Sequence, residues 1–156
     1  MSCPTKADAA KWPQPSPNFV PKQTYQVSFD KLWSAALDAL DNNRITTVSL
    51  DKATGIIQTD FIQGFSFHID LILSKGGNDT RYKYNLKLKE QTDGSFKLNI
   101  VCKIEESSYT ENGGTGWAEV GSRPIHKQLE TWLYEQIEKG LNSALTSAKH
   151  RRRSFR

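Results

Sequence analysis

Two alternating runs joined by a short turn constrain the fold of this chain more than any other feature. RYKYNLKLK spans residues 81–89 and FKLNIVCKIE spans residues 96–105, and each alternates apolar with polar side chains. The TDGS segment between them carries an Asp-Gly pair, which is typical of a hairpin turn. Strict alternation indicates antiparallel strands with one buried and one wet face. The side chains predicted to point inward are Tyr82, Tyr84, Leu86, Leu88, Phe96, Leu98, Ile100, Cys102 and Ile104.

Two amphipathic helices can cover the apolar side of this sheet. VSFDKLWSAALDALDNN (27–43) gathers its apolar residues on one helical face, with Ser28 as the expected N-cap and Asp30 in the first turn. A second helix is predicted to begin at Ser122, with Pro124 in its first turn, and to keep an apolar stripe to about residue 149. At ~1.5 Å per residue it is about 40 Å long, enough to cross a small sheet.

Further strands are predicted before the hairpin. They lie within QTYQVSF (23–29), RITTVSLD (44–51) and GIIQTDFI (55–62), and FSFHIDLIL follows after Gly64. Residues 106–121 are polar, contain NGGTG and are predicted to be a loop. The sequence therefore predicts one α+β domain of order β-α-β-β-β-β-α, in which a curved antiparallel sheet packs on a short N-terminal helix and a long C-terminal helix.

The two ends of the chain differ from this domain in composition. Residues 1–22 are predicted to be a proline-rich extended arm, residues 23–149 the folded domain, and residues 150–156 a basic tail. The net charge of +4 belongs to this end, because five basic residues fall in the last eight positions and leave 16 basic against 17 acidic residues elsewhere. A nucleic-acid surface spread over the whole fold is therefore disfavoured.

Three groups of residues are candidate binding sites. Trp12 and Phe19 in the arm either dock on a partner or fold back on their own domain. The tail arginines either bind lipid headgroups or nucleic acid, or form a frayed, solubilising end; they are Arg151, Arg152 and Arg153. Basic residues that alternate outward on the two long strands either meet an acidic partner or phosphate, or keep the sheet soluble. These strand residues are Arg81, Lys83, Lys87, Lys89, Lys97 and Lys103.

The spacing of titratable residues predicts no catalytic site, no cofactor and no metal. His68, His126 and His150 are isolated from one another, and His68 with Asp70 is typical of an ordinary polar pair on one strand face. No pair of cysteines or histidines has the spacing of zinc ligands, and GFSFH lacks the features of a nucleophile elbow. The chain is therefore predicted not to be an enzyme.

Two stretches resemble a known family. Residues 25–61, YQVSFDKLWSAALDALDNNRITTVSLDKATGIIQTDF, are similar to the opening of the BamC-like helix-grip domain of bacterial envelope lipoproteins, with DKATGIIQT as the most recognisable part. SRPIHKQLETWLYEQIEKGL (122–141) is similar to its closing helix. The likeness covers about residues 23–145 and consists of fold signatures, so it implies a fold and carries no active site.

The resemblance also implies a functional setting. In such lipoproteins a small residue precedes the cysteine that takes the lipid, and Ser2-Cys3 fits this pattern with Met1 as an added start. The implied protein is a non-enzymatic accessory or scaffold subunit of an outer-membrane or secretion complex. It would be held at the outer membrane by lipid on Cys3, with the arm as a periplasmic tether, and would bind other envelope proteins. Without a lipidated Cys3 the expected compartment is the cytoplasm.

Two other functions stay open at this point. A sheet that grips a long helix can enclose a small hydrophobic ligand, with a lining of Phe65, Phe67, Tyr82, Tyr84 and Trp132. Alternatively, the basic tail and the outward lysines bind nucleic acid or anionic lipid, with an affinity that falls steeply with salt.

Overall fold

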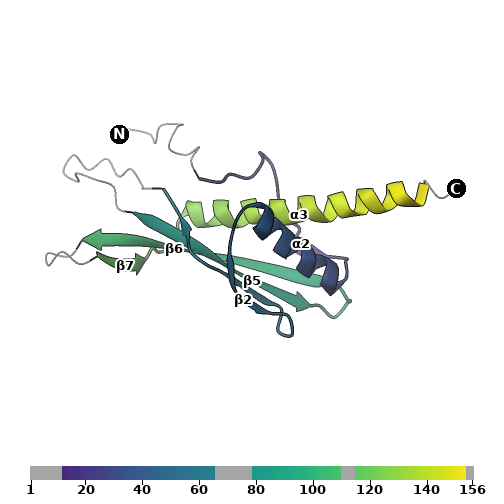
Figure 1. The fold of residues 1–156 in the computed structure, drawn as a ribbon, viewed down its shortest axis with the longest axis horizontal. Coiled ribbons are helices and arrows are strands. Elements are labelled where there is room, and N and C mark those ends of the chain that lie inside the picture. The colour runs from purple at the N-terminus through teal and green to yellow at the C-terminus, as the bar shows by residue number, and fades with distance from the viewer. Residues whose placement is uncertain (1–11, 66–78, 110–114, 154–156) are drawn as a thin grey trace.

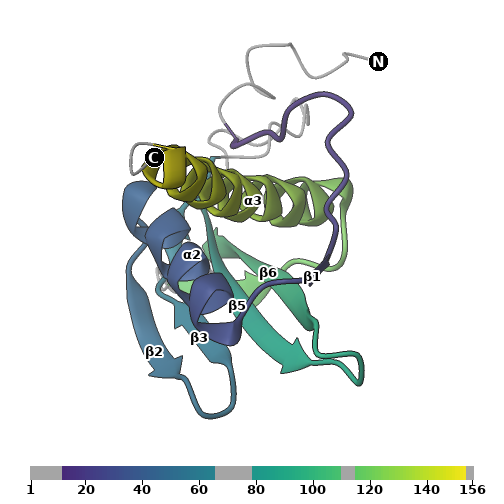
Figure 2. The same ribbon diagram turned by 90° about the vertical axis from the view of Figure 1, so that its right-hand side faces the viewer.

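The fold is α+β, with one antiparallel sheet covered on one face by two helices, as the sequence predicts (Figures 1 and 2). The computed structural model describes residues 12–65, 79–109 and 115–153. In chain order the elements are β1 (Thr24–Tyr25), α2 (Phe29–Asn42), β2 (Thr47–Asp51), β3 (Ile56–Thr59), β4 (Ile62–Gln63), β5 (Thr80–Glu90), β6 (Phe96–Tyr109), β7 (Thr115–Glu119) and α3 (Pro124–Arg153). Both helices lie on the same side of the sheet, and the C-terminal part of α3 extends beyond it.

The sheet is built around the β5–β6 hairpin. Its strand order is β1-β6-β5-β3-β2, with β4 also paired to β5 and β7 to β6. The hairpin register runs without interruption from Thr80 opposite Glu106 to Glu90 opposite Phe96. The alternation in the sequence therefore becomes two faces, because residues in direct register across antiparallel strands share a side of the sheet.

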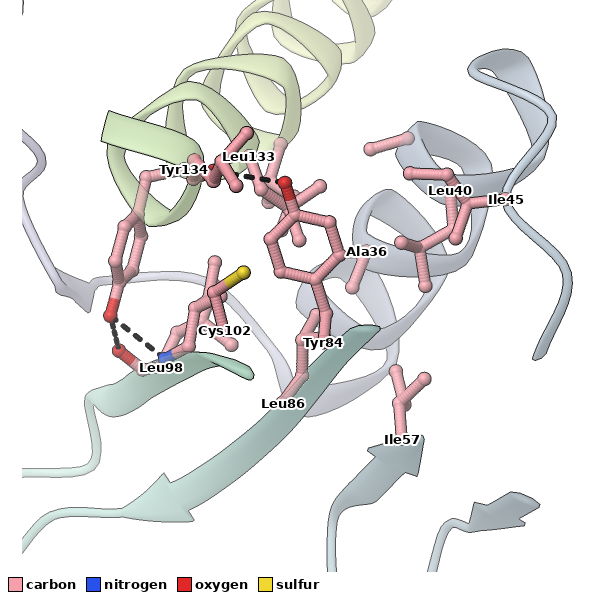
Figure 3. Close-up of a cluster of buried hydrophobic side chains, with 14 of the residues drawn as sticks. Ala36, Leu40, Ile45, Ile57, Tyr84, Leu86, Leu98, Cys102, Leu133 and Tyr134 are labelled. Carbon is pink, nitrogen blue, oxygen red and sulfur yellow. Dashed lines mark hydrogen bonds between the residues drawn. The ribbon is translucent and has the colours of Figure 1, made fainter. Parts of the chain in front are cut away.

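The core lies between the hairpin and the two helices (Figure 3). Ser28 caps α2 as expected, since its hydroxyl accepts from the Lys31 amide at 3.3 Å. The apolar stripe of each helix meets the inward side chains of the strands. Fully buried side chains come from both layers and include Leu32, Leu40, Ile57, Tyr84, Leu86, Leu98, Ile104, Leu129, Leu133 and Ile137.

Side chains of α3 complete the backbone hydrogen bonding of β6. β1 pairs with one end of this strand and β7 with the other, so its middle has no neighbouring strand on that side within the described residues. The Tyr134 hydroxyl donates to the Leu98 carbonyl at 2.8 Å and accepts from the Ile100 amide at 3.1 Å (Figure 3). The Glu130 carboxylate accepts from the Cys102 amide at 3.0 Å. These bonds satisfy polar groups whose burial without partners would be costly.

Several sequence predictions need correction. Residues 106–109 and 115–119, predicted to belong to a loop, are strands, because β6 continues to Tyr109 and β7 pairs with it. This part of the sheet is polar, so its strands are held by ladder hydrogen bonds and show no hydrophobic alternation. The predicted strand over 55–62 is two strands, β3 and β4, which both pair with β5. The last helix continues past residue 149 to Arg153, consistent with the good helix propensity of arginine. Most of the predicted FSFHIDLIL strand lies outside the described residues.

Replacing Tyr134 by phenylalanine should destabilise the fold more than replacing Tyr84 does. Tyr134→Phe leaves the Ile100 amide without its partner, so we expect a loss of about 1–3 kcal/mol in the free energy of unfolding. Tyr84 donates to the Leu129 carbonyl at 3.1 Å, which also belongs to the α3 hydrogen-bond ladder, so Tyr84→Phe should cost only about 1 kcal/mol. Urea unfolding of the two variants measures the difference, and equal losses would contradict the role given to Tyr134.

Candidate functional site

The sheet face opposite the helices carries five lysines, which we call the lysine face. Neither of the two described helices covers this side (Figure 1). Lys83 stands directly opposite Lys103, and Lys89 stands directly opposite Lys97. Within the described parts of the chain none of the five makes an ion pair. The lysine face consists of Lys83, Lys87, Lys89, Lys97 and Lys103.

The register of the lysine face works against stability. Like charges directly opposite one another on neighbouring strands repel, and two such pairs are present. Two further pairs separate them on this face: Asn85 lies opposite Val101, whose side chain is 49% exposed, and Lys87 lies opposite Asn99. An anionic surface bound to this face would both relieve the repulsion between the lysines and cover the exposed side chain of Val101.

Arg81 belongs to the same face but is already engaged. Its guanidinium carbon lies 3.9 Å from the centroid of the Phe61 ring and 4.1 Å from that of Trp117. The same guanidinium bonds Glu105, with 2.8 Å between Nη2 and Oε1 and 3.2 Å between Nε and Oε1. The charge of Arg81 is thus balanced by Glu105, and its guanidinium is held between two aromatic rings. Trp117, one of these rings, was not identified from the sequence because residues 106–121 were predicted to be a loop.

An open hollow adjoins one end of the lysine face. Its volume is about 510 Å³, and its lining includes Lys87, Lys89 and Lys52 beside the rings of Phe29 and Phe96. Lys52 pairs with Asp30 at 3.0 Å, whereas Lys87 and Lys89 have no carboxylate partner among the described residues. Glu90 also lines the hollow, so an acidic side chain received here would meet two lysines, one carboxylate and an apolar wall.

The arm aromatics lie against their own domain. Trp12 is only 6% exposed, and its ring centroid lies 5.6 Å from those of Phe65 and Tyr82. Phe19 is partly buried and also packs on the core. Of the two alternatives for Trp12 and Phe19, the structure therefore has the one in which the arm folds back, and it runs from β1 past α3 (Figure 2).

Two glutamates of α3 hold the arm and were not singled out from the sequence. Glu135 accepts from the Ser16 amide at 2.7 Å and also from the Ser16 hydroxyl. Glu138 accepts from the backbone amide of Lys22. Glu135 is 4% and Glu138 7% exposed, which is unusual for carboxylates. Two acids three positions apart on a helix are commonplace, so only the fold reveals their role.

The surroundings of the two glutamates shift their pKa values in opposite directions. Burial raises the pKa of Glu135, but bonds from Ser16 and the charge of Lys139 outweigh it and lower the pKa below 4.5. At Glu138 burial is again the largest influence, and with the charge of Glu135 it raises the pKa above 4.5 despite the Lys22 amide and charge. The ionised carboxylate of Glu135 therefore stabilises the docked arm, whereas ionisation of Glu138 costs free energy in the folded state.

Most of the other predicted site residues, or their side chains, are not among the described ones. Arg151, Arg152 and Arg153 form the end of α3, and their side chains lie outside the description. Cys3, Phe67, His68 and Asp70 fall outside the described residues altogether. His126 accepts from the Arg123 amide at 3.1 Å, an ordinary bond in the first turn of a helix. In residues 12–65, 79–109 and 115–144, no three His, Cys, Asp or Glu side chains are grouped as metal ligands would be.

The expected ligand-lining aromatics are packed against protein. Tyr82 and Tyr84 are 4% and 0% exposed, and their rings contact each other edge to face with 5.8 Å between centroids. Trp12 fills the space beside Tyr82. Burial, followed by the charge of Glu130, raises the pKa of the neighbouring Cys102 thiol, so this thiol stays protonated and unreactive. These contacts favour a filled core over a ligand cavity.

Comparison with protein-family models and with curated proteins found no match to this chain. Among the helices of the described residues, none combines the length and the apolar character that crossing a membrane requires.

Reversing one charge of the lysine face should stabilise the protein. In Lys97→Glu the new carboxylate faces Lys89, so we expect the free energy of unfolding to rise by about 0.5–1 kcal/mol at low salt and less at high salt. The double variant Lys89→Glu/Lys97→Glu again places like charges opposite each other and should lose this gain. Chemical denaturation of the unmodified chain, of Lys89→Glu and Lys97→Glu alone and of the double variant completes the cycle, and additive effects would argue against direct register.

The two buried glutamates should respond to neutralisation with opposite signs. Because the folded pKa of Glu135 is lowered, its stabilisation is present above pH 4.5 and is lost as the pH falls through the folded pKa, so Glu135→Gln should destabilise at pH 7. Because the folded pKa of Glu138 is raised, its ionisation costs stability at pH 7, so Glu138→Gln should stabilise there and become neutral below pH 4.5. Unfolding curves between pH 3 and 8 measure both effects, and shifts of the same sign would refute them.

Proposed function

We propose that this chain is a non-enzymatic binding protein that holds an acidic segment of a partner protein on its lysine face. The observation that carries this proposal is that two lysine–lysine pairs stand in direct cross-strand register without an ion-pair partner among the described residues. A surface whose only task is solubility gains nothing from placing like charges opposite each other. A surface that receives carboxylates gains affinity and a fast, steered association.

A protein segment suits this face better than a nucleic acid. Single-stranded nucleic acid is held largely by bases stacked on aromatic rings. The rings of Phe61 and Trp117 each have one side occupied by Arg81. Between the lysine pairs the face instead offers the amides of Asn85 and Asn99, the side chain of Val101 and a single lysine, Lys87, which suit the alternating side chains of an extended acidic peptide or strand.

The cellular setting of the proposal rests on the resemblance of residues 23–145 to envelope lipoproteins. In that setting the protein is an accessory subunit of a cell-envelope complex. A lipid on Cys3 would confine the domain close to the membrane and raise its effective concentration at partners there. Weak, salt-sensitive contacts between the lysine face and an acidic partner would then suffice. Mass spectrometry of the native protein tests this part separately, and an unmodified Cys3 would remove the anchor.

Neutralising one lysine pair should weaken binding of an acidic peptide. A fluorescein-labelled peptide of twelve alternating glutamates and serines serves as the probe, and fluorescence anisotropy gives its dissociation constant. We expect Lys83→Gln/Lys103→Gln to weaken binding about tenfold at low salt, with a smaller dependence on salt than the unmodified protein has.

The matched control removes two lysines from the helical side of the molecule. Lys31→Gln/Lys127→Gln changes the net charge by the same amount at two exposed positions, on α2 and α3, and should leave the affinity within about twofold. Equal losses in the two double variants would mean that only net charge matters and would sink the proposal. Tighter binding of a dT12 oligonucleotide than of the peptide, lost in the same pair variant, would assign the face to nucleic acid instead.

A further inference from the structure

We propose that the surface under the arm is a second recognition site, which takes a proline-rich segment of a partner protein anchored by a tryptophan. In the structure the chain's own residues 12–22 occupy this site and act as a built-in competitor. The site lies on the helical side of the sheet, away from the lysine face, so the inference does not depend on the function proposed above.

The anchor position is a slot shaped for an indole ring. Phe65 and Tyr82 contact the Trp12 ring at 5.6 Å between centroids, and Gly64 forms the end of the slot. A Cβ atom at Gly64 would lie 2.6 Å from the Cη2 atom of Trp12 and 2.5 Å from Oγ1 of Thr80. The slot therefore reaches its depth only because residue 64 has no side chain.

Beyond the anchor, side chains of α3 hydrogen-bond mainly to backbone atoms of the arm. The Gln128 amide donates to the Pro13 carbonyl at 3.0 Å. Glu135 receives the Ser16 amide at 2.7 Å, and Glu138 receives the Lys22 amide. Backbone contacts of this kind are open to other sequences that adopt the same extended path, and proline favours that path at low entropic cost.

The chain's own arm fits the site imperfectly. Under it lies a buried polar atom without a hydrogen-bond partner among the described residues, the Glu138 Oε2 atom. The Glu138 side chain is more than nine-tenths buried. The arm also keeps Asn18 and Gln23 at φ values of 65° and 63°, a region that side chains with a Cβ rarely adopt. An open hollow of about 580 Å³ remains between the arm and the start of α3.

These defects define the chemistry of a better occupant. It carries a tryptophan for the slot and prolines that keep the following residues extended. It also carries a hydroxyl or cationic side chain that donates to Glu138, whose second oxygen the arm leaves unpartnered. Such a segment would gain a charge-assisted bond that the arm lacks. It must still displace a tethered competitor whose effective concentration is on the order of millimolar.

The test adds the arm sequence in trans to a full-length chain whose own anchor is missing. The probe is a fluorescein-labelled peptide with the sequence of residues 11–22, KWPQPSPNFVPK. Fluorescence anisotropy should give at least tenfold tighter binding to Trp12→Ala than to the unmodified protein, in which the tethered arm competes. The same peptide with alanine in place of its tryptophan is the matched control and should bind at least tenfold more weakly.

A second variant guards against loss of folding. Ser16→Ala removes only the hydroxyl that Glu135 receives, so the fold should persist while the arm loosens. It should bind the probe more tightly than the unmodified protein does, though less tightly than Trp12→Ala. Equal binding of the two peptides, or no binding to either variant when circular dichroism shows it folded, would overturn the proposal.

Discussion

The hydrogen bonds between α3 and the middle of β6 are the constraint on which the rest of the structure depends. A strand that lacks a neighbour on one side exposes a row of unpaired amides and carbonyls, and a buried row of that kind is costly. Tyr134 and Glu130 supply the missing partners from a helix. These bonds fix α3 along the middle of β6. The hydrophobic core is then enclosed between this helix, α2 and the sheet.

Once α3 is placed in this way, the two sides of the sheet have different roles. One side is occupied by α2, by α3 and by the arm that crosses α3 (Figure 2). No described helix covers the other side, which carries lysines in register. Stability therefore comes from the helical side, where large apolar side chains are buried, and the open side can keep unfavourable charge pairs because the core compensates for them.

The fold and the candidate sites differ in how far the sequence could predict them. The β5–β6 hairpin, the cap of α2 by Ser28 and the start of α3 near Pro124 follow from local patterns, and each agrees with the structure. β7 was missed because its residues are held by ladder hydrogen bonds and not by an apolar stripe. The lysines were identified as outward-facing, but their alignment across strands depends on register, which no single run of residues contains.

By itself the sequence determined the class of the fold, the inward and outward sides of the long strands and the positions of the two helices. Each of these follows from a period of two or of 3.6 residues, and such periods are local. Only the tertiary structure decided that Trp12 belongs to the core, that Glu135 holds Ser16 and that Tyr134 completes β6. The Glu135 bond joins residues 119 positions apart, and the Tyr134 bond to Leu98 joins residues 36 positions apart. Contacts over such distances depend on how the layers pack, because no residue's neighbours along the chain reveal which distant group will lie beside it.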